Sequence, residues 1–289
     1  MKVLITGKGG QLAWELEDNL PIQYQLISLG IEDLDITDSV AVNKIIAMHQ
    51  PDVVINAAAY TAVDNAETDH VLAYAVNETG AKNLALACKI NNCRMLHVST
   101  DFVFDGSKTT PYQTGDVAKP LSVYGASKLA GDIAVQEILP DSVIVRSAWI
   151  YSVNANNFVK TMLRLMAEKS QLGVVYDQVG TPTWAAGLAQ WLWAVVAKPQ
   201  VNGMFHWTDA GVASWYDFAV AIQELAIEKG MLVRAIPIRP IPSSAYPTPA
   251  KRPAFSVIDK TSAEAAADML TIHWRTQLSK MLDKLKTSQ

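Results

Sequence analysis

The stretch KVLITGKGGQLAWEL, residues 2–16, decides the fold that the sequence predicts. Residues 2–6 have the length and the β-branched content of a buried strand, and leucines at helical spacing follow the glycines. Gly7, Gly10 and Ala13 therefore form a G-x-x-G-x-x-A pattern between a strand and a helix. Such a loop lets the backbone approach a pyrophosphate at the helix N-terminus, although a glycine turn by itself serves equally well as a plain connection.

The rest of the first half repeats this alternation of strand and helix. Apolar runs that fit buried strands lie at residues 2–6, 24–29, 52–59, 94–100 and 142–149. Stretches with helical periodicity separate them, at residues 38–49, 70–91 and 124–139. Strands that alternate with helices form βαβ units, so we predict an α/β protein with a Rossmann-type, doubly wound parallel sheet.

After about residue 150 the alternation loosens. Strands are predicted at 172–177 and 203–207, and helices at 155–168, 184–197 and 214–230. Proline then concentrates in residues 236–253, which excludes a central strand or a helix there. That segment is either a rigid surface linker or a loop that closes over a ligand. We predict a dinucleotide-binding domain at residues 1–150 and a smaller, mainly substrate-binding lobe at 151–289, some segments of which could return to the first domain.

The composition is that of an ordinary globular protein. Of the 289 residues, 50% are hydrophobic and 18% are charged, and the net charge of -4 offers no general attraction to nucleic acid or to an anionic membrane. No apolar stretch reaches the roughly 18 residues of a membrane span, and the first residues predict a strand rather than a signal peptide. We therefore expect a cytoplasmic protein with no nucleic-acid or membrane partner, and we interpret Cys88 and Cys93 as reduced structural thiols.

The pentapeptide YGASK, residues 124–128, carries the clearest catalytic signal. Tyr124 and Lys128 are four residues apart at the start of a helical stretch, so both side chains lie on one face. An ammonium group near a phenol stabilises the phenolate and makes the tyrosine a usable proton donor near neutral pH. Ser99 and Thr100 end the fourth predicted strand, and doubly wound folds bind ligands at the carboxyl ends of their strands.

The glycine loop, the hydroxyl group after the fourth strand and the Y-x-x-x-K motif occur in an order that resembles the extended branch of the short-chain dehydrogenase/reductase superfamily. Further stretches are similar to the dTDP-4-dehydrorhamnose reductase family, and this resemblance runs over essentially the full length. They are NAAAYTAVDNAE (56–67), STDFVFDG (99–106), NNFVKTML (156–163), DQVGTPT (177–183) and YPTPAKRP (246–253).

The resemblance implies an NAD(P)H-dependent reduction of the C4 ketone of dTDP-4-dehydro-L-rhamnose to dTDP-L-rhamnose. Tyr124 would protonate the developing alkoxide, Lys128 would hold the cofactor ribose, and Thr100 would orient the carbonyl oxygen. The cofactor-binding residues that the resemblance implies are Gly7, Lys8, Gly10, Gln11, Leu12, Asp35, Ile36, Ala58, Ala59, Tyr124 and Lys128. The implied substrate-binding residues are Thr61, Val63, Phe102 and Trp149 for the sugar, and Asn157, Lys160 and Arg252 for the nucleotide end.

The end of the second predicted strand bears on the choice of cofactor. It reads Ser28, Leu29, Gly30, without the carboxylate that holds the ribose 2′-hydroxyl in NAD-specific folds and without an arginine for a 2′-phosphate. Lys8 is the nearest cation in the sequence. We therefore predict NADPH as the cofactor, with NADH also accepted and a preference on the order of tenfold.

Some positions depart from the family pattern. Phe102 stands where the family often has tyrosine. Some members bind magnesium through acidic residues at a dimer interface. Glu15 matches one such position, but Ala186 and Lys284 replace two others, so we predict no metal. A homodimer is possible, without the ion that supports one in those members.

The sequence is also compatible with two other classes of function. One is a nucleotide-sugar epimerase or dehydratase of the same branch, although dehydratases usually carry a glutamate where Phe102 follows Thr100 and Asp101. The other is a non-catalytic NADP-binding subunit, similar to the regulatory β subunit of methionine adenosyltransferase. Other conspicuous side chains are interpreted as structural. They are His97, Trp184, Trp191 and Trp193.

Overall fold

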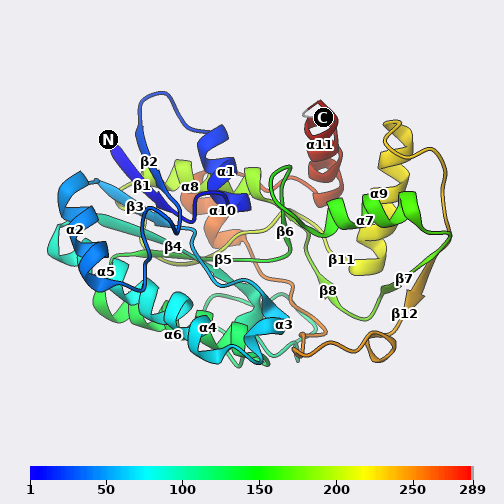
Figure 1. The fold of residues 1–289 in the computed structure, drawn as a ribbon, viewed down its shortest axis with the longest axis horizontal. Coiled ribbons are helices and arrows are strands. Elements are labelled where there is room, and N and C mark those ends of the chain that lie inside the picture. The colour runs from blue at the N-terminus through cyan, green and yellow to red at the C-terminus, as the bar shows by residue number, and fades with distance from the viewer. Residues whose placement is uncertain (288–289) are drawn as a thin grey trace.

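The computed structural model describes residues 1–287, and a six-stranded parallel sheet is its central layer (Figure 1). The strands are β1 (Lys2–Thr6), β2 (Gln25–Leu29), β3 (Val53–Asn56), β4 (Arg94–Thr100), β5 (Val143–Ser147) and β10 (Gly203–His206). They lie in the order β2-β1-β3-β4-β5-β10, and every neighbouring pair is parallel. The strand order reverses between β1 and β3, which is where folds of this kind bind their ligands.

Helices cover both faces of this sheet (Figure 1). On one face lie α1 (Gln11–Asp18), α8 (Ala185–Val196) and α10 (Thr261–Ala267), and on the other α2 (Ser39–His49), α5 (Ala81–Ile90) and α6 (Val123–Ile138). Each face has its own hydrophobic core, since alternate side chains of the strands point to opposite sides. The predicted doubly wound α/β sheet is confirmed.

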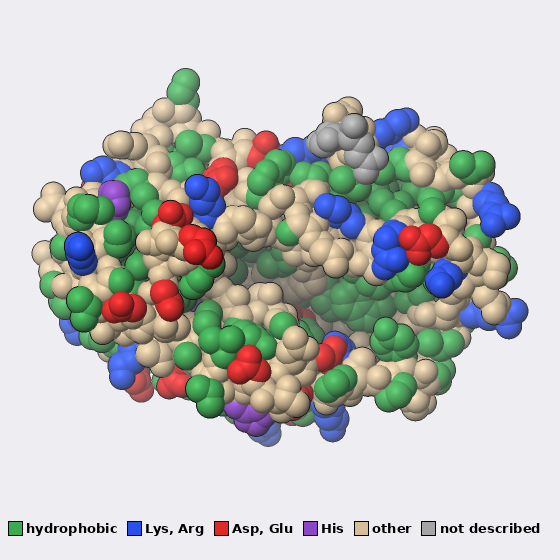
Figure 2. Space-filling view, viewed as in Figure 1, with side chains coloured by type: hydrophobic (Ala, Val, Ile, Leu, Met, Phe, Trp, Pro, Cys, Tyr) green, Lys and Arg blue, Asp and Glu red, His purple; other side chains and the backbone are tan. Residues whose placement is uncertain are grey.

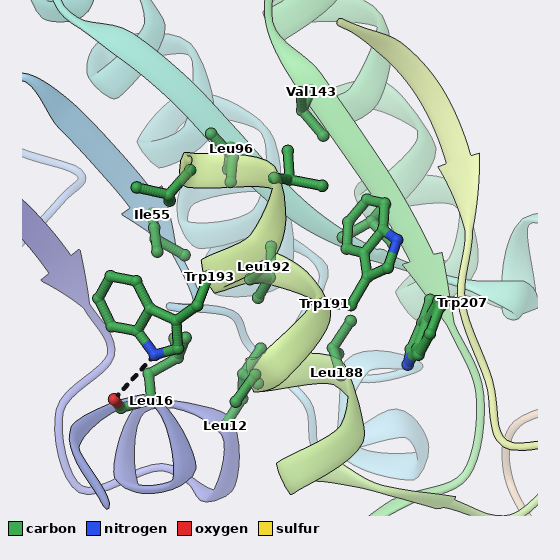
Figure 3. Close-up of a cluster of buried hydrophobic side chains, with 14 of the residues drawn as sticks. Leu12, Leu16, Ile55, Leu96, Val143, Leu188, Trp191, Leu192, Trp193 and Trp207 are labelled. Carbon is green, nitrogen blue, oxygen red and sulfur yellow. Dashed lines mark hydrogen bonds between the residues drawn. The ribbon is translucent and has the colours of Figure 1, made fainter. Parts of the chain in front are cut away.

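The tryptophans of α8 lie in the first of these cores (Figure 3). Trp191 is fully buried and donates its indole N–H to the Ala263 carbonyl at 2.8 Å, while Trp193 donates to the Leu16 carbonyl at 3.2 Å. Large aromatic surfaces are thus removed from water without an unpaired N–H group. Their interpretation as structural residues is confirmed.

Three elements from beyond residue 150 belong to this layered unit, namely α8, α10 and β10. Strand β10 pairs with β5 at the edge of the sheet, with Gly203 opposite Val143, and α8 packs against α1. The sheet is therefore complete only when chain from both halves of the sequence is present.

The remaining elements form a second lobe with its own core (Figure 1). It contains the helices α7 (Phe158–Glu168), α9 (Trp215–Glu228) and α11 (Trp274–Thr287). Short strands form three two-stranded sheets: β6 (Ile150–Tyr151) with β9 (Thr183–Trp184), β7 (Leu172–Val175) with β12 (Ile238–Ile241), and β8 (Val179–Gly180) with β11 (Ala213–Ser214). The proline-rich segment accordingly provides one short edge strand and the single turn η3 (Ser243–Ala245).

The stretch predicted as one helix at 70–91 is broken into three pieces. These are α4 (His70–Tyr74), the π-helix η1 (Ala75–Gly80) and α5. Inside the π turn, Asn77 is buried. Its side-chain oxygen accepts from the Tyr60 N–H, and its side-chain nitrogen donates to the Tyr60 carbonyl and the Ser127 hydroxyl. Sequence periodicity does not reveal this π turn, which holds Asn77 against partners 17 and 50 residues away.

Two shorter helical turns sit near the same edge of the sheet, α3 (Val63–Ala66) and the 3-10 turn η2 (Asp101–Val103). Within the described residues, no helix is long and apolar enough to cross a membrane. Cys88 and Cys93 are buried free thiols, as predicted.

Candidate active site

The glycine loop lies at the carboxyl edge of the sheet, at the point where the strand order reverses. Gly7 has a φ of +84°, and a Cβ there would lie 2.7 Å from the Ala57 carbonyl oxygen and 2.8 Å from the Ala58 nitrogen. Only glycine fits such a close approach. Gly10 precedes α1 without any side-chain cap, so the first N–H groups of that helix are free for an anion. This cradle fits a dinucleotide pyrophosphate.

The remaining residues predicted to bind the cofactor flank this cradle. Gln11 begins α1 and is half-buried, whereas the Leu12 side chain is in the core and has only its backbone to offer. Ala58 and Ala59 follow β3 and are half-buried. The cradle therefore presents mostly backbone and small side chains to a ligand.

The end of the cradle next to β2 holds a carboxylate, Asp33, that was not predicted from the sequence. Lys8 is exposed, and its backbone N–H donates to the Leu29 carbonyl at 3.1 Å, which brings the loop beside the end of β2. There the Asp33 carboxylate accepts from the Gly30 N–H at 3.0 Å. An aspartate three residues after a turn glycine was the available signal. Lys8 and Asp33 thus place opposite charges at the same end of the cradle.

Asp35 and Ile36 lie further along the same edge. Asp35 is exposed, and its carboxylate accepts from the N–H and the hydroxyl of Thr37, both at 2.8 Å. Ile36 is buried against Gly80, where a Cβ would come within 2.6 Å of the isoleucine side chain. Ile36 is therefore held by packing, and Asp35 by a local turn.

Thr100 and Tyr124 are brought together by a close contact between two helical turns. Ser122 caps α6 by accepting from the Gly125 N–H at 3.2 Å, and a Cβ on Gly125 would lie only 2.2 Å from the Phe102 carbonyl oxygen. The first turn of α6 therefore packs directly on η2. The Thr100 hydroxyl lies beside the Tyr124 phenol at the end of β4, and the Phe102 ring meets the Tyr124 ring edge-on, with centroids 5.7 Å apart.

The electrostatics of this cluster suit proton donation. Burial raises the pKa of Tyr124 to about 12, although the hydrogen bond with Thr100 opposes the rise. Lys128 is 2% exposed, donates to the Val98 carbonyl at 2.8 Å, and has its pKa lowered to about 8 by burial. Tyr124 is thus protonated at neutral pH, one helical turn from a cation.

The face seen in Figure 2 is hollowed between the sheet unit and the second lobe, with hydrophobic side chains on the lobe side. Trp149 has a φ of +46°, which is strained for a bulky residue, and its ring stacks on Trp215 with centroids 3.5 Å apart and planes 6° apart. A Cβ on Gly180 would clash with the Trp149 ring at 2.7 Å, and the Phe158 ring lies 4.7 Å from that of Trp215. Trp215 and Phe158 were not predicted as neighbours of Trp149, because aromatic residues at the start of a helix are usually core residues.

Asn157 and Lys160 link the second lobe to the glycine loop. The Asn157 side chain caps α7 by accepting from the Lys160 N–H at 3.2 Å, and its amide donates to the Gln11 side chain at 3.1 Å. Nearby, the Asn154 amide donates to the Gly9 carbonyl at 3.1 Å. The Lys160 ammonium donates to the Val153 carbonyl at 3.2 Å. These contacts join α7 directly to the loop that the sequence assigns to the cofactor.

Arg252 is held by a carboxylate of the first unit. Its guanidinium contacts Asp64 through two nitrogens, at 3.0 and 2.8 Å, and the Ala250 N–H donates to the same carboxylate at 3.1 Å. Asp64 lies in α3, which begins at Val63, two residues after the exposed Thr61. The structure therefore brings Arg252 together with the predicted sugar-binding segment and anchors the proline-rich chain there.

Glu15 is fully buried beside a cation of the protein itself. Its carboxylate accepts from the Ser152 hydroxyl at 2.7 Å and the Trp184 indole at 2.9 Å, and the Lys284 ammonium lies 3.4 Å away. The same ammonium contacts Asp18 at 2.6 Å. An ammonium group between two carboxylates does not fit a site for a hard dication, which requires several oxygen ligands. No group of three metal-binding side chains occurs in residues 1–287.

The model of the family described as RmlD substrate binding domain matches residues 1–287. The dTDP-4-dehydrorhamnose reductase of Aggregatibacter actinomycetemcomitans is 42% identical over 284 residues, covering 96% of this chain and 97% of that protein.

Solved structures agree with the sequence relatives. A dTDP-4-dehydrorhamnose reductase from Clostridium acetobutylicum matches with a TM-score of 0.93 at 41% identity, over 99% of this chain and 100% of that one. The dTDP-4-dehydrorhamnose reductase from Bacillus anthracis, solved in complex with NADP, also gives a TM-score of 0.93, at 32% identity, over 98% of this chain and 99% of that one.

Proposed function

The chain belongs to the dTDP-4-dehydrorhamnose reductase family, and on that premise we propose that it reduces the C4 ketone of dTDP-4-dehydro-L-rhamnose to dTDP-L-rhamnose with NADPH. The observation that carries this proposal is the cluster of Thr100, Tyr124 and Lys128 at the carboxyl edge of the sheet, next to the Gly7 cradle. A binding subunit needs the cradle but has no use for a buried phenol beside a hydroxyl group and a lysine.

Each member of the cluster has a separate task. Tyr124 transfers its phenolic proton to the C4 oxygen as negative charge develops there, and Thr100 donates a hydrogen bond to the same oxygen. Lys128 stabilises the phenolate that remains, because its ammonium lies one helical turn away and is shielded from water. The raised pKa of Tyr124, about 12, keeps the phenol protonated until the ketone begins to accept charge.

The cradle provides the site for the reductant. In this proposal the pyrophosphate binds beside Gly7 and Gly10 and accepts hydrogen bonds from the free N–H groups of α1, and Lys8 lies at the adenosine end. NADPH bound there would supply the hydride. NADH is proposed as a weaker alternative, because Lys8 is the charge that favours a 2′-phosphate and Asp33 opposes it.

The substrate lies, on this proposal, in the hollow between the two lobes (Figure 2). Trp149, Phe102 and Val63 offer apolar contacts to a deoxysugar, and Thr61 offers a hydroxyl. Lys160 and Arg252 are proposed for the diphosphate, since guanidinium and ammonium groups donate charge-assisted hydrogen bonds to phosphate. To do so, Arg252 must share or give up its contact with Asp64.

The direct test is NADPH oxidation, followed by the absorbance of the reduced nicotinamide, with dTDP-4-dehydro-L-rhamnose present and absent. We expect oxidation only with the sugar, and NMR of the product should show a hydroxyl-bearing carbon at C4. Rearranged sugar without net NADPH consumption would identify an epimerase instead. Tight NADPH binding without any turnover would identify a binding subunit.

A further inference from the structure

A line of buried polar side chains runs beneath the active site, across three strands of the sheet. Thr6 ends β1, Asn56 ends β3, and His97 lies in the middle of β4. The Thr6 hydroxyl donates to the Asn56 carbonyl oxygen at 2.8 Å, and the Asn56 amide nitrogen lies 3.0 Å from His97 Nδ1. All three side chains are about 1% exposed. Buried polar groups are costly unless they are paired, so this line requires an explanation.

The direction of the hydrogen bonds along this line is fixed by the backbone. The Ala58 N–H, which can only donate, points to Asn56 Oδ1 at 3.2 Å. The other end of the Asn56 amide must therefore donate to His97 Nδ1. A neutral imidazole that accepts at Nδ1 carries its proton at Nε2. Burial and the charge of Lys128 hold the pKa of His97 well below its usual value, so the ring is neutral.

The proton on His97 Nε2 faces a carboxylate of α6. Nε2 lies 3.6 Å from Asp132 Oδ1, just beyond hydrogen-bond distance, and neither atom makes a hydrogen bond within the described part of the chain. The Ser99 hydroxyl also lies beside this carboxylate. The second oxygen of Asp132 accepts from Arg146 Nε of β5 at 3.2 Å. Asp132 is 1% exposed and follows Lys128 by four residues on α6, so the two side chains lie on one face of that helix.

We propose that Asp132 is a positioning residue for the reduction: its carboxylate, which Arg146 holds and the His97 ring faces, keeps the Lys128 ammonium charged one helical turn from Tyr124. This inference rests on the proposed function.

The groups around Lys128 raise or lower its pKa, either directly or through Asp132. Asp132, on the same helix, favours the charged form of Lys128, whereas burial disfavours it. Arg146 from β5 and neutral His97 from β4 both face Asp132, and Asp101 of η2 faces Tyr124. Burial raises the pKa of Asp132, and Arg146 and Lys128 oppose that rise. Removing the negative charge of Asp132 must therefore make Lys128 lose its proton at a lower pH.

The test is the pH profile of kcat for the wild-type chain and for Asp132→Asn and Asp132→Glu. The alkaline limb should move to lower pH by about one unit in Asp132→Asn, the low end of the effect of one neighbouring charge, and should return toward the wild-type position in Asp132→Glu. Glu137→Gln is the matched control, because it removes the same charge from an exposed position of α6, and its limb should not move.

Two results would overturn the role of the charge. One is an unmoved alkaline limb in Asp132→Asn. The other is an equal shift in Asp132→Asn and Asp132→Glu, since that pattern comes from altered packing. A wild-type chain that oxidises no NADPH with the dehydro-sugar refutes the proposed reductase activity instead.

A measurement without turnover tests the network itself, even if Asp132→Asn does not fold. Long-range ¹H–¹⁵N NMR of the histidine side chains should show His97 neutral, with its proton at Nε2, throughout the range from about pH 6 to pH 9. The signals of His97 are identified by their absence in His97→Gln. A proton at Nδ1, or a ring that titrates in this range, would contradict the network.

Discussion

The edge proposed for the cofactor and the residues proposed for the substrate are held in place in different ways. The first region is held by backbone geometry. Gly7 and Gly125 allow close backbone contacts that no Cβ would permit, and the ends of the parallel strands fix the positions of the neighbouring residues. In the second region, side chains hold one another, as Trp149 does with Trp215 and Arg252 with Asp64. Substitutions at a few positions of the first region should therefore cause large losses of activity. Substitutions in the second region should cause smaller losses, mainly through weaker substrate binding.

Replacement of the proposed proton donor tests the first region with the largest expected effect. Tyr124→Phe should lower kcat by roughly 10²–10⁴-fold, because the C4 oxygen loses its acid, while NADPH affinity changes little. Steady-state kinetics and NADPH titration by fluorescence measure the two quantities separately. Turnover near that of the wild type would show that the proton comes from elsewhere.

The aromatic stack tests the second region with an intermediate effect. Trp215→Ala removes the support of a strained Trp149, so kcat/KM should fall roughly tenfold, mostly through KM. Trp215→Phe is the matched control and should keep most of the affinity. Two tryptophan rings 3.5 Å apart give a coupled circular-dichroism band, which both variants should lose. An unchanged KM in Trp215→Ala would separate the stack from substrate binding.

Cofactor choice gives a smaller effect, again at the backbone-held edge. Lys8→Ala should reduce the NADPH-to-NADH ratio of kcat/KM by up to about tenfold, or about 1.4 kcal/mol, because one exposed charge-assisted contact is lost. Asp33→Asn should raise the same ratio, since it removes the opposing charge at Gly30. Ratios that stay equal to that of the wild type would place the 2′-phosphate away from both residues.

Metal removal should have no effect. Lys284 provides a cation beside Glu15 and Asp18, so dialysis against EDTA is expected to leave the rate unchanged. A loss of rate that magnesium restores would locate a metal site outside these residues.

The same contrast explains how much the sequence could predict. The cradle, the β4 hydroxyl and the Tyr124–Lys128 pair were predictable because each is a short motif whose geometry depends on local backbone. The parallel sheet and most element positions followed from periodicity. The membership of β10 in the first sheet did not, because pairing with β5 joins residues 60 positions apart, Val143 and Gly203.

Apart from Asp33, whose partner Gly30 is three residues away, the missed features depend on partners distant in sequence. Asp64 and Arg252 are 188 residues apart, and Trp149 and Trp215 are brought together by the second core. His97 was interpreted as a structural residue, but the strand pattern could not show that Asn56 and Asp132 flank its ring on opposite sides. Asn157 was assigned to substrate, and only the fold reveals its bond to Gln11.

The place of β10 at the sheet edge also affects how the chain folds during its synthesis on the ribosome. When residue 147 has emerged, β5 is still an open edge, and the face later covered by α8 is bare apolar surface. This condition lasts until residue 206 has been synthesised and released from the exit tunnel. We therefore expect ribosome-associated chaperones to bind the nascent chain while this edge and this face are exposed. Ribosome-stalled chains of increasing length should become protease-resistant only after β10 is free, and resistance of a chain that ends near residue 150 would show that the edge closes without it.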